Sequence, residues 1–240
     1  GAADHKYSRG YVAVLAGEMP GAAALTAAAA LRAGAGYVRL LADEPVVGVP
    51  SAVVQGGHGS GIDDPRIGAI VAGPGLGRGL HARQLLGAAL SAGRPLVLDA
   101  DALNILAEEG GAALADAILT PHAGEFARLF GRVGGSKVEQ ARTAAAGAGA
   151  VVVFKGPDTV VAAPDGRAAI GASESHWLAS AGTGDVLAGI IAAVRASGLE
   201  AFEAACAAVW LHNRAALLAG PALIADDLVV QLPAAVAECL

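Results

Sequence analysis

Short runs of Val, Leu and Ile alternate along the chain with longer Ala-rich stretches that have the spacing of helices. The apolar runs predict buried strands, because runs of this length and composition suit a sheet whose two faces are both covered. We expect strands at the start of the segments 11–17, 37–42, 69–79, 95–109, 117–131 and 150–170. We expect helices over 21–34, around 80–92, and in the later parts of 95–109 and 117–131. The alternation predicts an α/β fold with a mostly parallel central sheet and helices on both faces.

Some parts of the chain depart from this alternation. The Gly-, Pro- and Ser-rich stretch 45–66 has no readable pattern. Pro164-Asp165-Gly166 predicts a hairpin turn between two short strands. After Asp185 the pattern predicts helices only, with one over 201–219 and the last over about 225–238. The residues of 201–219 that are expected to face the core are Phe202, Cys206, Val209, Trp210 and Leu217.

Length and composition bound the class of protein. The 240 residues suit one domain over 1–240. Mean hydropathy is +0.55, yet no stretch reaches the ~18–20 uninterrupted apolar residues of a membrane-spanning helix, so we expect no membrane partner. A net charge of −6 without a Lys/Arg-rich run argues against nucleic acid as a partner.

Cys206 and Cys239 form neither a metal spacing nor a disulfide framework, which fits a reducing, cytoplasmic location. The start at Gly1, without Met or a signal peptide, suggests a piece of a longer protein.

Glycine-rich and polar loops follow four of the predicted strands. The carboxyl ends of parallel strands meet at one edge of a sheet, where ligands bind in open α/β folds. The first loop, GPGLGRG at 73–79, has Arg78 where a dinucleotide fingerprint needs its third glycine. The chain also lacks the Gly-Lys-Ser/Thr of a phosphate loop. The loop is therefore either a tight turn or a place where a ligand approaches the backbone closely.

The next two loops carry acidic residues. In LDADALN, Asp101 is expected to cap the following helix, or else Asp99 holds a magnesium–water shell or a ligand hydroxyl. In TPHAGE, His122 and Glu125 are three residues apart, which puts both on one face of a helix that starts there. Glu125 is either a partner of the helix dipole or, with His122, a contact to a ligand or a metal-bound water. Zinc is not expected, because no third ligand lies nearby in sequence.

The fourth of these loops brings a cation, and the separate stretch AGTGD brings a helix start. Lys155, in FKGPDT, is either an exposed surface lysine or the positive charge beside a phosphate. In AGTGD, a helix that begins at Gly184 or Asp185 would present unpaired N–H groups to an anion. Asp185 is then a helix cap, or a base that accepts a proton from a substrate hydroxyl beside that anion. The second arrangement is the one that phosphoryl transfer requires.

In this order the loops and strands resemble the ADP-dependent NAD(P)H-hydrate dehydratases, which are members of the ribokinase-like superfamily. The resemblance covers nearly the whole chain. It rests on HKYSRGYVAVLAG, GAAALTAAAALRAGAG, VAGPGLG, LVLDADALN, LTPHAGE, VFKGPDT, GTGDVLAGIIAA and LIADDL. It implies a three-layer ribokinase-like fold. It also implies dehydration of the S-form of NADHX and NADPHX, in which the hydrate hydroxyl is phosphorylated, phosphate is eliminated and ADP becomes AMP.

The resemblance implies a role for each candidate residue. Asp185 would be the catalytic base and would also contact the substrate. The other substrate contacts would be Ala22, Gly75 and His122. The anion hole would consist of Gly182, Thr183 and Gly184. ADP, or ATP, would bind to Lys155, Gly156, Pro157, Asp158, Thr159 and Gly184. Glu125 would hold Mg²⁺ through water. The family likeness also favours a homo-oligomer and leaves open an epimerase domain in the full-length chain.

Two departures from the family pattern bear on the substrate. Residues 174–185 read ESHWLASAGTGD where the family reads close to GNPGMATGGSGD, so His176 and Trp177 replace small residues beside the site. Thr183 keeps the hydroxyl of the usual serine. The stretch 45–66 lacks the Pro-Glu segment expected after the second strand. Two other functions stay open: an ATP-dependent kinase of a small alcohol, such as a hydroxyethylthiazole- or sugar-like substrate, and a nucleotide-binding sensor without turnover.

Overall fold

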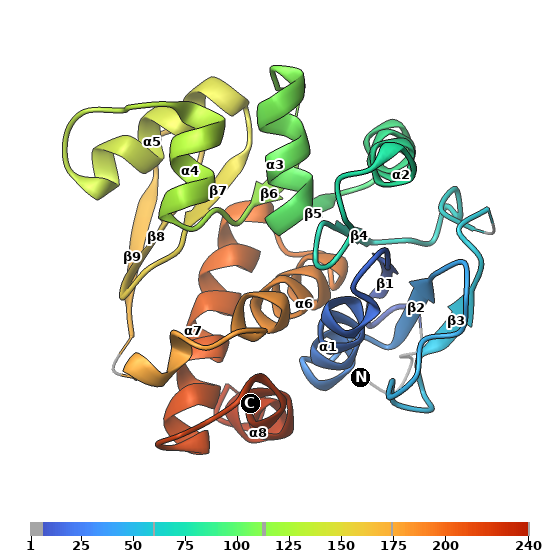
Figure 1. Cartoon of the computed structure of the whole chain (residues 1–240). Coiled ribbons are helices and arrows are strands. Elements are labelled where there is room, and N and C mark those ends of the chain that lie inside the picture. Colours follow the sequence, from blue (N-terminus) through green and yellow to red (C-terminus); the bar gives the residue numbers. More distant parts are fainter. Residues whose placement is uncertain (1–6, 60, 112–113, 174, 240) are drawn as a thin grey trace.

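A single nine-stranded sheet runs through the computed structural model, which describes residues 7–59, 61–111, 114–173 and 175–239 (Figure 1). The strands lie in the order β3-β2-β1-β4-β5-β6-β7-β8-β9. Their bounds are β1 Tyr11–Leu15, β2 Tyr37–Leu41, β3 Val54–Gly56, β4 Ala69–Ala72, β5 Leu96–Leu98, β6 Ala117–Leu119, β7 Val151–Phe154, β8 Asp158–Ala162 and β9 Ala168–Ala172. The pairs from β3 to β7 are parallel, whereas β8 pairs antiparallel with both β7 and β9. The prediction of a mostly parallel sheet is confirmed, as is the hairpin turn at 164–166.

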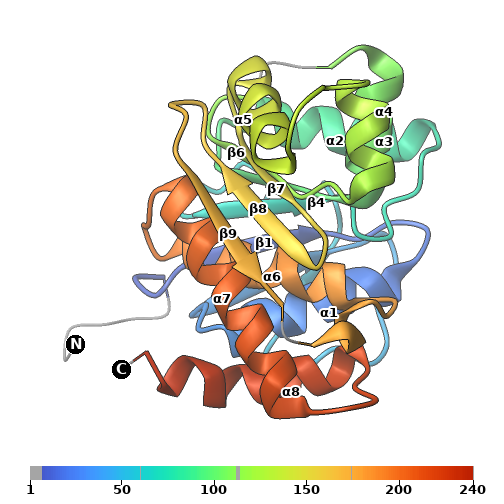
Figure 2. The same cartoon turned by 90° about the vertical axis from the view of Figure 1, so that its left-hand side faces the viewer.

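Helices cover both faces of the sheet, as the alternation predicts. Their bounds are α1 Pro20–Arg32, α2 Leu80–Ser91, α3 Ala100–Glu109, α4 Ala123–Phe130, α5 Lys137–Ala148, α6 Thr183–Ala196, α7 Ala201–Ala219 and α8 Ala225–Ala237, with a short 3-10 turn η1 at His176–Leu178. One core contains buried side chains of α1, α6, α7 and α8, and the other contains those of α2, α3, α4 and α5. Figures 1 and 2 show these two groups on opposite sides of the strands. No helix of the described ranges is long and apolar enough to cross a membrane.

Strand β1 shows how one strand serves both cores. Val12 and Val14 lie in one core, and Tyr11, Ala13 and Leu15 lie in the other. All five side chains are buried, which explains why the sequence of this strand is apolar throughout rather than alternating. The fully buried strands are rigid, so they fix the positions of the loops that follow them along one edge of the sheet.

Several sequence-based expectations are corrected by the structure. Strand β3 lies inside the stretch 45–66, where no element was predicted; Val54 and Gln55 are exposed on this edge strand, so no buried apolar run marks it. Helix α6 begins at Thr183, one residue before the earlier of the two expected starts, which were Gly184 and Asp185.

In α7, Phe202 and Val209 face the core as expected, but Trp210 and Leu217 are 46% and 40% exposed. The core face of α7 is instead composed mainly of alanines. Residues 5–6 and Glu174, which belong to the quoted family segments, lie outside the described residues.

Candidate active site

The loops singled out in the sequence follow the carboxyl ends of adjacent parallel strands. Gly73 follows β4, Asp99 follows β5, Pro121 and His122 follow β6, and Lys155 follows β7. The strands are neighbours in the order β4-β5-β6-β7, so their loops lie side by side along one edge. The first turns of α1 and α6 lie in direct contact with this edge. The sheet edge is therefore the place where the candidate residues meet.

The glycine loop after β4 packs against its neighbours without room for side chains. A Cβ at Gly73 would lie 1.8 Å from the carbonyl oxygen of Asp99. Gly75 has φ +62, and a Cβ there would lie 2.2 Å from the Met19 carbonyl oxygen and 3.0 Å from the Cβ of Ala22. The structure thus brings together Ala22 and Gly75, two of the expected substrate contacts. A glycine is required here because only a residue without Cβ permits so close a backbone approach.

Asp101 has a different role from the one expected. Asp99, not Asp101, occupies the N-cap position of α3, and its side chain makes no capping hydrogen bond. Asp101 lies in the first turn, where its Oδ2 accepts a hydrogen bond of 2.9 Å from the N–H of Gly77. The prediction that Asp101 caps the helix is therefore wrong. The helix starts directly after the strand, so Asp101 lies two residues beyond the N-cap position, and it fixes the glycine loop instead.

A buried ion pair lies between two of the loops. Lys155 Nζ donates to Asp99 Oδ1 at 2.7 Å, and the two side chains are 19% and 2% exposed. Burial acts to lower the pKa of Lys155, but the carboxylates of Asp99, Glu125 and Asp185 outweigh it and hold that pKa above its ordinary value. Lys155 is therefore a fixed cation. It is not the exposed surface lysine of the first alternative, and in this structure its charge is paired with that of Asp99.

Asp185 lies in the first turn of α6, next to this ion pair. A Cβ at the preceding Gly184 would lie 3.3 Å from Lys155 Nζ and 3.7 Å from Asp99 Oδ2. Burial, followed by repulsion from Asp99, raises the pKa of Asp185 to about 6 even though Lys155 opposes the shift. A carboxyl group with this pKa is mostly ionised at neutral pH, but it binds a proton more readily than an ordinary aspartate.

The start of α6 offers backbone donors. Gly182 is its N-cap residue, with φ +86 and no side-chain cap. The N–H of Thr183 has only a long contact of 3.5 Å to the Ser180 carbonyl, and those of Gly184 and Asp185 have no backbone acceptor among the described residues. The Thr183 hydroxyl is directed at the carbonyl oxygens of Leu178 and Ser180, at 2.8 and 2.9 Å. An anion at this helix start would therefore meet N–H groups rather than that hydroxyl.

Two buried side chains that the sequence did not single out fix the first turn of α6. The Thr26 hydroxyl of α1 is directed at the carbonyl oxygens of Ala22 and Asp185, at 3.0 and 3.1 Å. His212 of α7 lies 2.9 Å, through Nε2, from the carbonyl of Thr183, so Nε2 carries a proton. Burial lowers the pKa of His212 to about 4, which keeps it neutral. Each residue lies inside an Ala-rich apolar helix, and only its polarity within that face could have marked it.

His122 and Glu125 do contact each other, as their spacing predicts. His122 is the N-cap of α4, and its Nδ1 accepts from the N–H of Gly124 at 2.9 Å. Glu125 accepts at Oε2 from the N–H of His122 at 2.9 Å, and its Oε1 lies 3.3 Å from His122 Nε2. The Glu125 side chain is 6% exposed, whereas that of His122 is 55% exposed. This capping box locks Glu125 in place and leaves lone pairs of its carboxylate available to water.

Residues 155–157 form the turn between β7 and β8, and Asp158 and Thr159 begin β8. Thr159 closes the turn by donating from Oγ1 to the Gly156 carbonyl at 2.9 Å. Lys137, at the start of α5, donates from Nζ to Oδ1 of Asp158 at 2.7 Å and to its carbonyl at 2.9 Å. The same ammonium lies 4.9 Å from the centre of the Phe154 ring. Lys137 is thus a second cation beside the expected nucleotide contacts, and nothing near it in sequence signals this.

Comparison with known proteins decides the family. Residues 12–231 match the family described as NAD(P)H-hydrate dehydratase. The chain belongs to this family. It is 41% identical over 233 residues to the ADP-dependent (S)-NAD(P)H-hydrate dehydratase of Neisseria meningitidis, a match that covers 88% of this chain and 78% of that protein. It is 40% identical over 232 residues to the bifunctional NAD(P)H-hydrate repair enzyme Nnr of Mycobacterium leprae, covering 91% of this chain and 47% of the relative.

Solved structures confirm the ribokinase-like fold. The ADP/ATP-dependent NAD(P)H-hydrate dehydratase of Bacillus subtilis, co-crystallised with ATP and Mg²⁺, superposes with a TM-score of 0.84 at 31% identity and covers 99% of this chain and 92% of that one. A ribokinase-like superfamily protein of Enterococcus faecalis gives a TM-score of 0.89 at 22% identity, covering 99% and 90% of the two chains, which shows the fold alone. The chain spans about half the length of most of the bifunctional relatives it matches, at 47%, 49% and 45% for the first three.

Proposed function

We propose that this member of the NAD(P)H-hydrate dehydratase family catalyses the ADP-dependent dehydration of (S)-NADHX and (S)-NADPHX. The observation that carries the proposal is the half-buried carboxyl of Asp185 at the start of α6, beside the Lys155–Asp99 ion pair. Its pKa is about 6, mainly because of burial. The Neisseria and Bacillus relatives, which carry this activity in their names, support the choice of substrate.

Asp185 would act as the base. The hydroxyl of the hydrate would lose its proton to the Asp185 carboxylate while its oxygen forms a bond to the terminal phosphorus of ADP and the bond to AMP breaks. The N–H groups at the start of α6 would stabilise the charge that builds up on the transferring phosphoryl oxygens. Subsequent loss of phosphate breaks the C–O bond, and loss of a proton from the neighbouring ring carbon restores the double bond.

The nucleotide would lie along Lys155–Thr159 with its terminal phosphate toward Gly184. The turn between β7 and β8 offers exposed backbone there, and Lys155 and Lys137 add positive charge on either side. Ala22, Gly75 and His122 would contact the hydrated dinucleotide on the other side of Asp185. The close packing of Gly75 against Met19 and Ala22 fixes the glycine loop relative to the first turn of α1.

The side chains fit a Mg²⁺ ion held through water. Glu125 is buried, is fixed by the capping box and adds its charge to those of Asp99 and Asp185 around Lys155. Oxygen ligands and retained waters are what Mg²⁺ requires. Glu125 would orient its water shell, and the ion would supply charge neutralisation on the phosphates.

The decisive experiment supplies (S)-NADH hydrate, ADP and Mg²⁺ to the purified protein. We expect the absorbance of the reduced nicotinamide to return and AMP to appear in equal amount. Asp185→Asn should lower the rate by about 10²–10⁴-fold, whereas Asp165→Asn, in the exposed β8–β9 turn, should not. No recovery with either ADP or ATP would refute the dehydratase. A stable phosphorylated alcohol in its place would identify the small-alcohol kinase, and tight nucleotide binding without turnover would identify the sensor.

Three further properties of the protein are part of the proposal. We infer a cytoplasmic location, where NADH and NADPH are used, and a homo-oligomeric state. The bifunctional relatives are about twice as long as this chain, so an epimerase domain in the full-length protein is consistent with their names. Sedimentation of the purified chain, and the sequence of the complete gene product, test the last two.

A further inference from the structure

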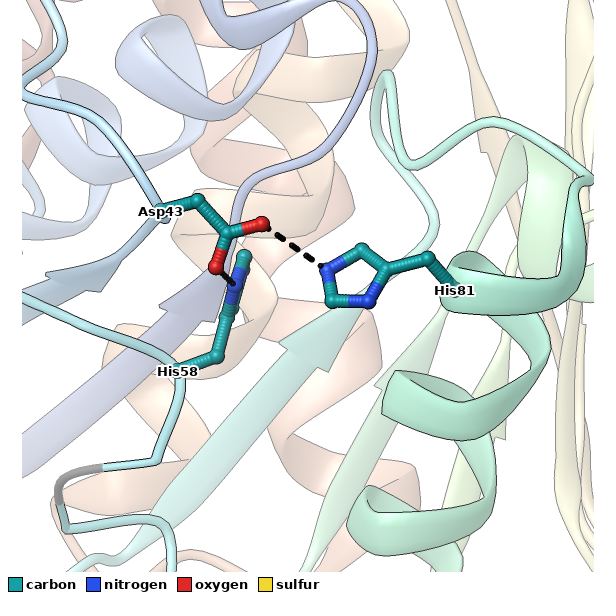
Figure 3. Close-up of side chains that lie close together, drawn as sticks. All are labelled: Asp43, His58 and His81. Atoms are coloured by element: carbon teal, nitrogen blue, oxygen red, sulfur yellow. Dashed lines mark hydrogen bonds and ion pairs between the residues drawn. The ribbon is translucent and has the colours of Figure 1, made fainter.

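A cluster of two histidines and one aspartate lies outside the residues assigned to the reaction. Asp43 follows β2, His58 follows β3, and His81 lies in the first turn of α2. Asp43 Oδ1 is 2.8 Å from His58 Nδ1, and Asp43 Oδ2 is 3.1 Å from His81 Nε2. One ligand atom from each of the three residues lies within 4.8 Å of the others. Figure 3 shows the Asp43 carboxylate between the two rings.

The hydrogen bonds of His58 indicate that a positive charge lies between its ring and Asp43. Its other ring nitrogen, Nε2, lies 2.8 Å from the carbonyl oxygen of Ala16. A carbonyl only accepts, so Nε2 must carry a proton. In the neutral ring, Nδ1 then bears a lone pair, and it faces the carboxylate of Asp43 at 2.8 Å. Two acceptors at that distance repel, so this position needs a positive charge: a second proton on His58 or a metal cation.

The donor set decides which cation would suit the position. Two imidazole nitrogens and a carboxylate match Zn²⁺ and similar divalent transition metals, whereas Mg²⁺ and Ca²⁺ prefer oxygen ligands alone. An N–H donated to a backbone carbonyl, as His58 donates to Ala16, is the usual outer hydrogen bond of a metal-binding imidazole. The His58 side chain is 9% exposed, which fixes its ring.

We propose that Asp43, His58 and His81 bind one divalent transition-metal ion of the Zn²⁺ type. With metal–ligand bonds of about 2.0–2.1 Å, tetrahedral ligand atoms lie about 3.4 Å apart, and the present separations of up to 4.8 Å allow this after small rotations. Asp43 and His81 are 66% and 56% exposed, so their side chains have room to adjust. Three protein ligands leave a fourth position for water.

Such an ion would link the loop after β2, the loop after β3 and the first turn of α2. His81 is the second residue of α2, which begins directly after the glycine loop 73–79, and Asp43 and His58 flank the stretch that contains edge strand β3. The ion would therefore fix the outer end of this sheet edge. This proposal does not depend on the proposed dehydration, because none of the three residues is assigned to it.

Calorimetric titration of the whole chain with ZnCl₂, in the presence of excess Mg²⁺, tests the site. We expect one Zn²⁺ per chain, a rise in Tm of several degrees, and X-ray absorption with two imidazole nitrogens at about 2.0–2.1 Å from the metal. His81→Ala and Asp43→Asn change exposed side chains and should each weaken Zn²⁺ binding about tenfold or more. An unchanged Tm of the metal-free variants excludes misfolding.

Two control variants locate the ion. His176→Asn changes another partly exposed histidine and should keep the wild-type affinity. His122→Asn tests the other histidine–carboxylate pair and should also keep it. The proposal is overturned if the wild type shows no saturable Zn²⁺ binding, which leaves His58 as a doubly protonated partner of Asp43. It is equally overturned if His122→Asn abolishes binding while His81→Ala does not.

Discussion

At the scale of single residues, Asp185 must be ionised to act as a base, yet its surroundings favour the protonated form. Burial and the nearby Asp99 raise its pKa to about 6, so the charged form that a base needs is the form that this environment disfavours. The rate should therefore depend on the ionisation of this one group. We expect kcat/KM to fall about tenfold per pH unit below pH 6, because Asp185 is then protonated and accepts no proton. Lys155, with its pKa above the ordinary value, contributes no change in this range.

The variant Asp99→Asn tests that assignment. It removes a negative charge that raises the pKa of Asp185, and it leaves Lys155 to interact more strongly with Asp185. Both changes stabilise the ionised carboxylate, so the acid limb of the pH–rate profile should move to lower pH. A limb that stays near pH 6 in this variant would mean that another group controls the rate. The profile is measured as kcat/KM, which reports the free protein.

The same residue should limit stability. A raised pKa means that the folded state binds the proton of Asp185 more tightly than the unfolded state does. The stabilising contribution is therefore complete below pH 3.8 and is lost as the pH rises through about 6. At pH 8 we expect Asp185→Asn to increase the free energy of unfolding by about 1–2 kcal/mol although it lowers the rate of the reaction. Urea denaturation at pH 8 and pH 5 measures the gain, which should shrink at the lower pH. Asp165→Asn, at an exposed position, should show no such gain.

At the scale of elements, the contact between α1 and α6 holds Ala22 and Asp185 close together, because the Thr26 hydroxyl lies 3.0 Å from the Ala22 carbonyl oxygen and 3.1 Å from that of Asp185. Gly189 makes this contact possible: a Cβ there would lie 2.3 Å from the Thr26 carbonyl and 2.9 Å from the Cβ of Ala29. Gly189→Ala should therefore push the helices apart and cost about 1–3 kcal/mol, despite the better helix propensity of alanine. Gly87→Ala in α2 is the matched control, because open space surrounds it. It should gain about 0.5–1 kcal/mol. Equal effects in thermal denaturation would contradict the role of the close contact.

The elements also show what the sequence can and cannot predict. The four loops after β4, β5, β6 and β7 were found because each follows a buried apolar run, and the sheet then brings them together. The cap at Asp101 was mispredicted because α3 begins directly after Asp99, a difference of two residues. In α7, alanines form the core face, so the large residues Trp210 and Leu217 point outward although they share the helical spacing. The Asp43–His58–His81 cluster depends on edge strand β3, which no apolar run marks. Pairings across the sheet, such as Lys155 with Asp99, need the fold itself.

At the scale of the whole molecule, the strands join the two cores into one structure. Alternate residues of β1 enter opposite cores, so neither core can lose its packing while the strand stays in place for the other. This favours the single domain expected from the length, and it predicts one cooperative unfolding transition. Leu40 and Leu86 provide the test, because they are fully buried in different cores on opposite faces of the sheet.

Leu40→Ala and Leu86→Ala should each cost about 2–5 kcal/mol, because each leaves a cavity in a packed core. Trp177 lies in η1 beside Leu178, which packs against the core that contains Leu40, and Trp210 lies in α7, whose buried face belongs to the same core; their fluorescence therefore reports mainly on that side of the sheet. If the molecule unfolds as a unit, Leu86→Ala must shift the tryptophan transition in urea as far as it shifts the far-UV circular dichroism. Two separate steps, with the tryptophan signal unmoved by Leu86→Ala, would instead show that each face of the sheet unfolds independently.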